Sequence, residues 1–262
     1  MTLYKGDCLE VMKSIPDGSV DAIITDPPYG TTACKWDSVI PFEPMWEELN
    51  RIIKPNGAIV LFGSEPFSSA LRMSNIKNYK YDWIWNKING ANFMNIKNRP
   101  LKTQEQIMVF FNDSNITFNP IKVRRTEASL KRDKAGTKRL VKVKKSRNSV
   151  VEHYGMKRTK GDEVREFSEF KHCVDIITFS KSEKGMYKIK HPTRKPVALM
   201  EYLIKTYTNE NETVLDFTMG SGSTGVAAKN LNRNFIGIEK DEKYFKIAEE
   251  RINKQEKQLK IL

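Results

Sequence analysis

The stretch that decides the fold is Val214–Ala228, which reads VLDFTMGSGSTGVAA. It begins as a short apolar run typical of a buried strand and continues through glycines into residues that favour a helix. Gly220, Gly222 and Gly225 form a G-x-G-x-x-G pattern, and Glu239 ends the next apolar run 19 residues after Gly220. Glycines in such a turn allow a ligand to lie against the backbone, and the acid can bind ribose hydroxyls. The pattern predicts a nucleotide-like ligand on an α/β fold.

Two ligands fit this turn. A dinucleotide would place its pyrophosphate at the N-terminus of the helix, whereas S-adenosylmethionine has no phosphate but would present its ribose to Glu239. A P-loop is not expected, because the lysine that follows the last glycine of that motif is missing. The alternative is a tight strand-to-helix turn that binds no ligand and has only a structural role. The turn alone leaves both ligands open.

Strand-like and helix-like runs alternate on both sides of this turn. Val20–Thr25, for example, is an apolar run stopped by prolines. The alternation predicts an α/β domain with a mostly parallel sheet. The expected strands are Val20–Thr25, Ala58–Phe62, Tyr81–Trp85, Gln106–Phe111, Val174–Ile177, Thr213–Phe217 and Phe235–Glu239; the expected helices cover Phe42–Ile53, a segment with Pro196 in its first turn, and Glu242 to about Leu259.

The basic charge of the chain is unevenly distributed. Residues 119–172 contain 17 Lys or Arg against 7 Asp or Glu, so about a fifth of the chain carries +10 of the net +13. The alternation of strands and helices fails in the same segment, which we interpret as an inserted element. Clustered basic charge suits a phosphate backbone, although a solvated basic surface would give the same count.

A second short motif, Asp26-Pro27-Pro28-Tyr29, ends the predicted strand Val20–Thr25. An exocyclic base amine is a poor nucleophile because its lone pair is delocalised into the ring. Two acceptors aimed at its N–H bonds, the Asp26 carboxylate and the Pro27 carbonyl, would localise that lone pair for attack on a sulfonium methyl. The prolines fix φ, and Tyr29 offers a flat face to an extruded base. The motif predicts methyl transfer to an amine; a strand-ending turn is the alternative.

The sequence argues against several other classes of protein. No apolar run reaches the roughly 18 residues that span a bilayer, and the N-terminal residues lack the apolar core of a signal peptide. Cys8, Cys34, Cys173 and the three histidines lack the spacing of a metal site or a disulfide framework. We therefore expect reduced thiols, no metal and no membrane partner.

Taken together, the two motifs resemble the N6-adenine/N4-cytosine DNA methyltransferase family in its β-class order. In that class the Asp-Pro-Pro-Tyr motif lies near the N-terminus, the glycine motif near the C-terminus and the target-recognition region between them. The resemblance implies a Rossmann-like methyltransferase fold with a mostly parallel seven-stranded sheet, base flipping and S-adenosylmethionine as cofactor. It divides the chain into a catalytic domain in two parts, 1–118 and 175–262, around a basic target-recognition insert, 119–174.

The resemblance also assigns residues to roles. Residues 191–196 match the family segment whose helix helps to close the methionine pocket, and Gly6-Asp7-Cys8 resembles the element whose Asp meets the cofactor adenine amine. One departure is Gln104-Glu105, where relatives often have His-Glu. The catalytic set is Asp26, Pro27, Pro28 and Tyr29; the expected cofactor-binding set is Asp7, Cys8, Asp26, Thr193, Lys195, Asp216, Phe217, Gly220, Ser221, Gly222, Ser223, Thr224 and Glu239; the expected DNA contacts are Arg124, Arg125, Lys144 and Lys145.

Asp as the first residue of the catalytic motif resembles adenine-N6 enzymes more than cytosine-N4 enzymes, which more often have Ser there. We therefore expect methylation of adenine N6 in double-stranded DNA, with cytosine N4 as the alternative. More distant alternatives are an NAD-type oxidoreductase, an inert DNA-binding protein, and an RNA or protein-amide methyltransferase. Relatives of this class are often dimers, which favours a homodimer, and a cognate restriction endonuclease is left open as a partner. The expected location is the cytoplasm of a bacterial, archaeal or phage-infected cell.

Overall fold

The computed structural model describes residues 1–31, 37–91, 96–112, 115–132, 169–181 and 194–259, apart from the side chains of 91 and 255–259. The chain divides into two compact units. The first comprises Met1–Asn119 with Val174–Leu262, and the second comprises Pro120–Cys173. Among the described residues, no helix is long and apolar enough to cross a membrane.

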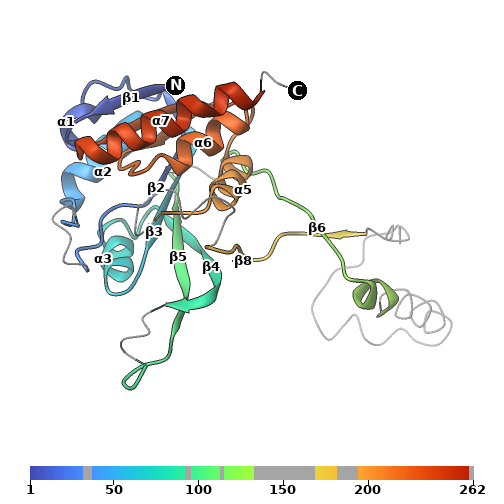
Figure 1. Ribbon diagram of the computed structural model, residues 1–262. Coiled ribbons are helices and arrows are strands. Elements are labelled where there is room, and N and C mark those ends of the chain that lie inside the picture. The colour runs from blue at the N-terminus through green and yellow to red at the C-terminus, as the bar shows by residue number, and fades with distance from the viewer. Residues whose placement is uncertain (32–36, 92–95, 113–114, 133–168, 182–193, 260–262) are drawn as a thin grey trace. The chain divides into compact units, whose positions relative to one another are not determined.

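An eight-stranded sheet forms the centre of the first unit (Figure 1). Only β5 pairs antiparallel with its neighbours, and every other pairing within the sheet is parallel. The predicted α/β fold with a mostly parallel sheet is confirmed. The strands, in spatial order, are β1 (Thr2–Lys5), β10 (Asn234–Glu239), β9 (Thr213–Asp216), β2 (Val20–Thr25), β3 (Ile53–Gly63), β5 (Lys102–Phe110), β4 (Tyr79–Ala91) and β8 (Ile176–Thr178).

The expected count of seven strands is wrong. The strand that the sequence did not predict is β1, a four-residue edge strand that pairs parallel with β10. At the other edge, β8 runs over Ile176–Thr178, where the sequence predicted Val174–Ile177. The start of β3 also differs from the prediction, because the strand runs through Lys54–Gly57 instead of beginning after it. Its register against β2 shifts there: Val20 faces Ile53, but Ala22 faces Ala58. Such a bulge absorbs the extra residues while both strands keep their pairing.

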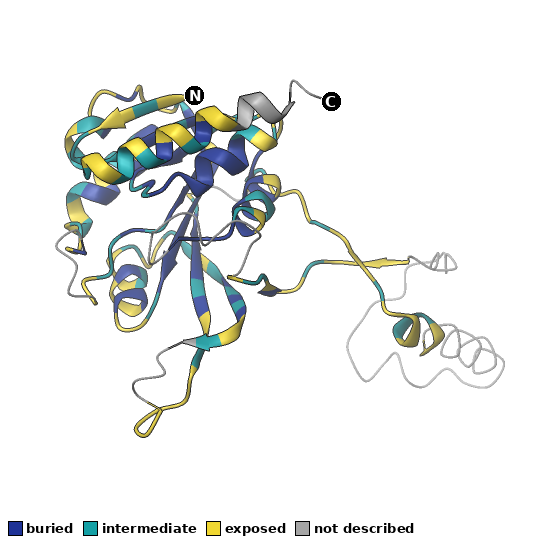
Figure 2. Ribbon diagram, in the orientation of Figure 1, coloured by how far each residue is buried: buried dark blue, intermediate teal, exposed yellow. Residues whose placement is uncertain are grey.

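Helices cover both faces of the sheet, and the pattern of burial reflects this arrangement (Figure 2). All six residues of β2 are buried, as expected for a strand between two layers of helices. On one face α1 (Cys8–Met12), α2 (Phe42–Ile52) and α3 (Phe67–Ser74) enclose an apolar cluster. Helices α5 (Val197–Tyr207), α6 (Ser223–Asn230) and α7 (Glu242–Leu259) pack in that order on the other. Pro196 is the N-cap of α5 and not part of its first turn.

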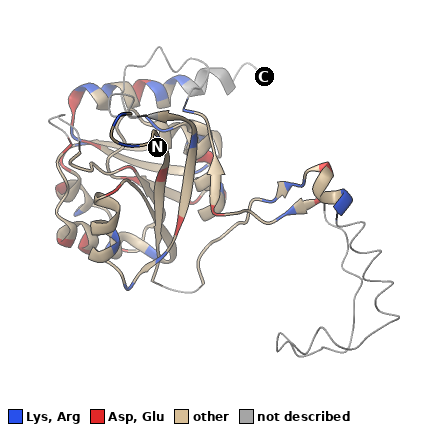
Figure 3. Cartoon of the chain, turned by 90° about the horizontal axis from the view of Figure 1, so that it is seen from below, with Lys and Arg blue, Asp and Glu red and all other residues tan. Residues whose placement is uncertain are grey.

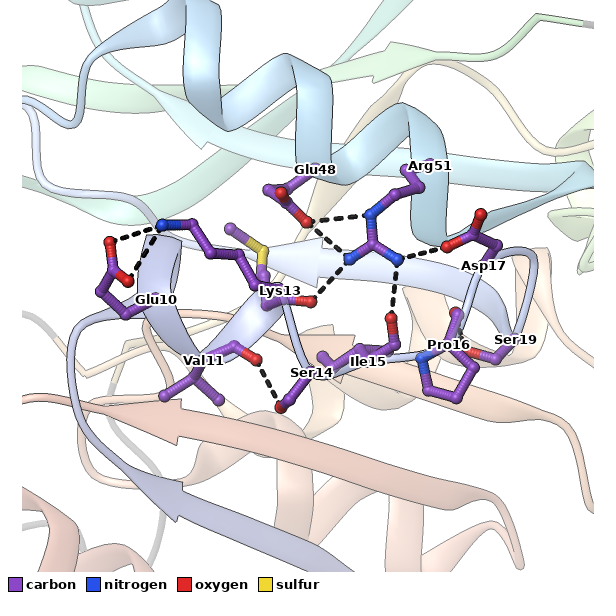
Figure 4. Close-up of polar contacts among 11 residues, drawn as sticks. Glu10, Val11, Lys13, Ser14, Ile15, Pro16, Asp17, Ser19, Glu48 and Arg51 are labelled. Atoms are coloured by element: carbon purple, nitrogen blue, oxygen red, sulfur yellow. Dashed lines mark hydrogen bonds and ion pairs between the residues drawn. The ribbon is translucent and has the colours of Figure 1, made fainter.

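The loop between α1 and β2 is fastened by Arg51 in the last turn of α2 (Figure 4). Its guanidinium donates to the carbonyl oxygens of Met12 and Ile15, both at 2.8 Å. It also pairs with Asp17 at 2.5 Å and with Glu48 at 2.6 Å. One planar group can serve four acceptors because its five N–H donors lie in a fixed fork. The contact therefore fixes the entry into β2.

The second unit contains a short two-stranded ribbon. Strand β6 (Val123–Arg124) pairs antiparallel with β7 (Phe170–Lys171), and residues 127–132 are helical. Figure 3 shows the basic end of this helix, formed by Lys131 and Arg132. Lys144 and Lys145, two of the expected DNA contacts, lie outside the described residues.

We expect Arg51→Met to lower the free energy of unfolding by about 1.5–3 kcal/mol, because two carbonyl groups and two carboxylates lose a charged donor. Urea unfolding followed by circular dichroism measures the change. Lys13→Met is the matched control, since the Lys13–Glu10 pair is exposed and should contribute nothing measurable. An unchanged unfolding midpoint in Arg51→Met would contradict this role for Arg51.

Candidate active site

Four carboxylates gather at one edge of the sheet. Strands β1, β10, β9 and β2 are consecutive and parallel, so their carboxyl ends lie side by side. Asp7 follows β1, Glu239 ends β10, Asp216 ends β9 and Asp26 follows β2. This edge is where open α/β sheets bind their ligands. The two sequence motifs, almost 200 residues apart in the chain, therefore form one site.

The glycine-rich turn is held in place from both sides. Gly220 has φ of +52° and donates its N–H to the Glu239 carboxylate at 2.9 Å. Gly222 has φ of +77° and caps α6, and a Cβ there would lie 2.9 Å from the Cβ of Ala248 on α7. A Cβ on Gly225 would lie 2.7 Å from Phe235. The last two glycines thus serve helix packing, which leaves Gly220 as the one turned toward the strand ends.

Asp216 is a buried carboxyl group held by its neighbours. Its Oδ2 accepts from the Thr224 hydroxyl at 2.5 Å, and its Oδ1 accepts from the Thr218 N–H at 3.2 Å. Burial raises the pKa of Asp216 to about 7, although these hydrogen bonds oppose the rise. Thr224 is only 2% exposed, so its structural role is to orient Asp216.

The other predicted cofactor residues are more varied in their surroundings. Phe217, Ser221 and Ser223 are all buried. The Phe217 N–H donates to the Thr25 hydroxyl at 3.1 Å, and the Ser221 hydroxyl accepts from Arg251 of α7 at 3.1 Å. These contacts stabilise the turn through residues of β2 and α7. Thr193 lies outside the described residues.

Asp7 and Cys8 lie at the start of α1. Asp7 caps this helix by accepting the Leu9 N–H at 3.0 Å, and its second oxygen pairs with Lys240 at 3.0 Å. Burial raises the pKa of the Cys8 thiol to about 11, so the thiol is neutral at physiological pH. Cys8 therefore contributes shape and not charge to the site.

The Asp26 carboxylate contacts two other side chains of the site, Tyr29 and Lys195. One oxygen accepts from the Tyr29 hydroxyl, and the other pairs with Lys195 at 2.5 Å. The Asp26 carbonyl accepts from the Thr218 hydroxyl at 3.1 Å, which ties the catalytic motif to the glycine-rich turn. The Tyr29 ring stacks on Phe67 of α3, with ring centroids 5.1 Å apart.

A second carboxylate, Glu105 of β5, completes this group. Its Oε1 accepts from Lys195 at 2.8 Å and from the Tyr29 hydroxyl at 3.1 Å, and its Oε2 pairs with Lys87 of β4 at 2.5 Å. Burial raises the pKa of Glu105, but the two ammonium groups outweigh it and hold the pKa at about 2. For Asp26 burial is the largest effect, and the pKa of this carboxyl is raised.

The turn after the motif is clamped by Asp37. One oxygen accepts the N–H groups of Tyr29 and Gly30 at 2.8 and 2.9 Å, and the other accepts that of Thr31 at 3.0 Å. Gly30 has φ of +68°, a backbone conformation that favours glycine. This clamp explains how an irregular turn keeps Tyr29 beside Asp26.

The carboxylates at this edge suit one of the two ligands left open by the sequence. Asp7 and Asp216 add negative charge that disfavours a pyrophosphate and suits an amino group and a sulfonium, whereas Glu239 suits ribose hydroxyls, which both ligands have. Glu239 retains acceptor capacity beyond its bonds to Gly220 and Asp241. The residues present therefore fit S-adenosylmethionine better than a dinucleotide. Among the described residues, no cluster of His, Cys, Asp and Glu could hold a metal ion.

Comparison with known proteins agrees with this arrangement. The family model described as DNA methylase, of the N6 and N4 class, matches residues 20–250. This chain belongs to the DNA methylase family. Its relatives include the Type II methyltransferase M2.LlaDCHI of Lactococcus lactis subsp. cremoris, 30% identical over 96% of this chain and 89% of the relative. The Type II methyltransferase M1.MboII of Moraxella bovis is also 30% identical, over 97% of each chain.

Solved structures resemble this methylase over nearly its whole length. The M1.HpyAVI–SAM complex has a TM-score of 0.61 and 28% identity, and covers 95% of this chain and 98% of its own. The cytosine-N4-specific PvuII DNA methyltransferase has a TM-score of 0.64 and 18% identity, and covers 95% and 85%. At that identity the second likeness concerns the fold alone.

Three residues of the methylase site were not found from its sequence. Lys87 and Glu105 come from the β4–β5 pair, and Asp37 follows the Asp26–Tyr29 motif in the chain. The sequence did offer a clue to Glu105, since it occupies the second position of the family's His-Glu pair. It offered no clue to Lys87 or Asp37, because their partners come from other strands or from backbone N–H groups. Lys195, expected at the cofactor, contacts Asp26 and Glu105.

Proposed function

We propose that this DNA methylase transfers a methyl group to adenine N6 in double-stranded DNA after flipping the base out of the stack. The observation that carries the proposal is the Asp26 carboxylate, which lies at the strand end next to the glycine-rich turn and is tied to it through Thr218. Asp at this place resembles the adenine-N6 members of the family. Methylation of cytosine N4 is the competing outcome.

S-adenosylmethionine is the methyl donor of this methylase, and it supplies an electrophilic methyl group on a sulfonium. Within the site we assign the ribose hydroxyls to Glu239, the adenine amine to Asp7 and the amino group to Asp216. The turn formed by Phe217–Gly222 would lie along the methionine portion. This assignment is supported by the order of the strands, which places the three carboxylates in a row beside Asp26.

The motif residues activate the amine. The Asp26 carboxylate and the Pro27 carbonyl would accept its two N–H bonds and localise the nitrogen lone pair. Proximity supplies much of the remaining rate acceleration, because a methyl group held in line with the nitrogen reacts as though the two belonged to one molecule. The N–CH3 bond forms as the S–CH3 bond breaks, and the proton lost from nitrogen passes to Asp26 and then to solvent. Tyr29, held by Phe67, would stack on the flipped base.

The basic second unit is our proposed DNA-recognition element. Of its described residues, Lys122, Arg124, Lys131 and Arg132 are exposed. Arg124 lies in β6, which its pairing with β7 holds extended. A ribbon with exposed cations suits contacts to phosphates, and base-edge contacts from the same unit would select the sequence. We extend this role to Arg125, Lys144 and Lys145.

We further propose a homodimer in the cytoplasm of a bacterial cell, acting beside a cognate restriction endonuclease. The Type II methyltransferases among the relatives support the last point.

The product of the reaction tests the proposal directly. Unmethylated plasmid DNA, incubated with the protein and S-adenosylmethionine and digested to nucleosides, should contain N6-methyladenine by mass spectrometry. Asp26→Ala should lower this product by at least about a hundredfold, because the lost acceptor matters most in the transition state. Its S-adenosylmethionine affinity should stay within about threefold of the wild type.

Three results would overturn this assignment. N4-methylcytosine as the product would mean that cytosine, not adenine, is the methylated base. DNA without any methylated product would support an inert DNA-binding protein. Near wild-type turnover of Asp26→Ala would remove Asp26 from the mechanism.

Glu239→Ala should weaken S-adenosylmethionine binding by about 1.5–3 kcal/mol, the range for hydrogen bonds to a charged group. Isothermal titration calorimetry measures this change. Glu242→Ala is the control, since this exposed carboxylate begins α7 and pairs only with Lys5 and Lys246 among the described contacts. Micromolar binding of NAD, with none of S-adenosylmethionine, would refute the cofactor assignment.

Neutralising Arg124 and Arg125 together to Gln should weaken DNA binding and flatten its salt dependence. Each lost phosphate contact should lower the slope of log affinity against log salt by about 0.9. The control removes the same charge from α7, through Lys246→Gln with Lys254→Gln, two exposed residues. If both double variants keep the wild-type slope and affinity, the second unit is not the DNA-binding element.

A further inference from the structure

Glu105 lies at the centre of a buried network of charges. Its side chain is 8% exposed and that of Lys87 is 7% exposed, and the two pair at 2.5 Å. Lys195 is 9% exposed and lies 4.9 Å from the centre of the Phe62 ring. With Asp26, the group contains two carboxylates and two ammonium ions. Charges this poorly solvated are tolerated only when they are paired, so each member depends on the others.

The Lys195 ammonium is shared between the two carboxylates. It lies 2.5 Å from an Asp26 oxygen and 2.8 Å from a Glu105 oxygen. The Tyr29 hydroxyl is shared in the same way, between Asp26 and Glu105. Every donor on Asp26 among these side chains is therefore also drawn toward Glu105. The Tyr29 hydroxyl has one proton to divide between the two carboxylates, whereas the Lys195 ammonium can give each a separate N–H and divides its positive charge between them.

We propose that Glu105 is a positioning residue for methyl transfer: by sharing Lys195 and Tyr29 with Asp26, it sets how strongly the Asp26 carboxylate accepts from the target amine. This inference rests on the methyl transfer proposed above. Without the charge of Glu105, Lys195 would pair with Asp26 alone and compete with the amine for the same carboxylate. Asp26 would then be a weaker acceptor and a weaker base.

The charged groups around Asp26 determine the direction of the expected pH effects. Lys195 precedes α5 and lowers the pKa of Asp26, whereas Glu105 on β5 raises it. Asp216 at the end of β9 and Lys181 after β8 also interact with Asp26 through their charges. Lys87 on β4 reaches it through Glu105. Removing the Glu105 charge should therefore lower the pKa of Asp26, and removing the Lys87 charge should raise it.

The test is the pH profile of single-turnover methyl transfer, with tritiated S-adenosylmethionine and unmethylated plasmid DNA at saturation. Glu105→Gln keeps the size of the side chain and should slow transfer at least about tenfold at about pH 8. Its acid limb should move to lower pH, so that the rate at about pH 5.5 relative to that at about pH 8 rises at least about threefold. S-adenosylmethionine affinity should change less than about threefold.

Lys87→Met tests the same inference, and the expected shift of its acid limb is in the opposite direction. Its acid limb should move to higher pH, and the same ratio of rates should fall at least about threefold. This variant also keeps the inference testable if Glu105→Gln does not fold. Glu65→Gln is the matched control, because Glu65 is half-exposed near the same edge and pairs with Arg72 outside the network. Its profile should coincide with that of the wild type.

A slower rate at every pH, with unmoved acid limbs in both variants, would overturn the inference and leave Glu105 with a purely structural role. Limbs that move in the same direction in Glu105→Gln and Lys87→Met would also overturn it. Failure of the underlying function looks different, since the wild-type protein itself would then transfer no methyl group to an exocyclic amine.

Discussion

The parallel pairing of β2 with β9 is the constraint on which the site depends. Ala22 lies opposite Val214 and Ile23 opposite Leu215, although these pairs are 192 residues apart in the chain. Because parallel strands end at the same edge, this register places Asp26 beside the turn that follows Asp216. The hydrogen bond from the Thr218 hydroxyl to the Asp26 carbonyl joins the two ends directly. A methyl donor and a methyl acceptor can be held by two motifs only if those motifs are adjacent in space.

Burial gives the carboxylates of this edge different properties. Asp216 has hydroxyl and backbone donors, so burial prevails and its pKa rises to about 7. Glu105 is equally buried, but Lys195 and Lys87 hold its pKa at about 2. Asp26 is also buried and its pKa is raised, but its one lysine is shared with Glu105. The same side-chain chemistry thus yields a group that can titrate near neutral pH and one that remains charged.

The glycine-rich turn shows how one pattern serves two purposes. Gly222 and Gly225 are glycines because α7 and β10 pack against them, and a Cβ would collide with Ala248 or Phe235. Gly220 instead donates its N–H to Glu239, the residue that we assign to the ribose. The pattern is therefore a mark of the strand–turn–helix unit as much as of a ligand. The acids around the turn discriminate between S-adenosylmethionine and a dinucleotide.

Local sequence was sufficient to predict the α/β architecture, the two motifs and most strand positions. Apolar runs, prolines and glycines act within a few residues, and Val20–Thr25 or Gly220–Gly225 carry that information in themselves. Strand β1 could not be predicted as part of the sheet, because it has four residues, none of them buried, and is defined by its pairing with β10. The roles of Lys87, Glu105 and Asp37 were also beyond the sequence. A buried charge is recognisable only beside its partner, and the partners of these residues come from other strands or from backbone N–H groups that folding brings within 3.0 Å. Residue order thus determined which chemical groups this methylase has, and the tertiary structure decided which of them share a charge, because Coulomb interactions depend on distance in space and not along the chain.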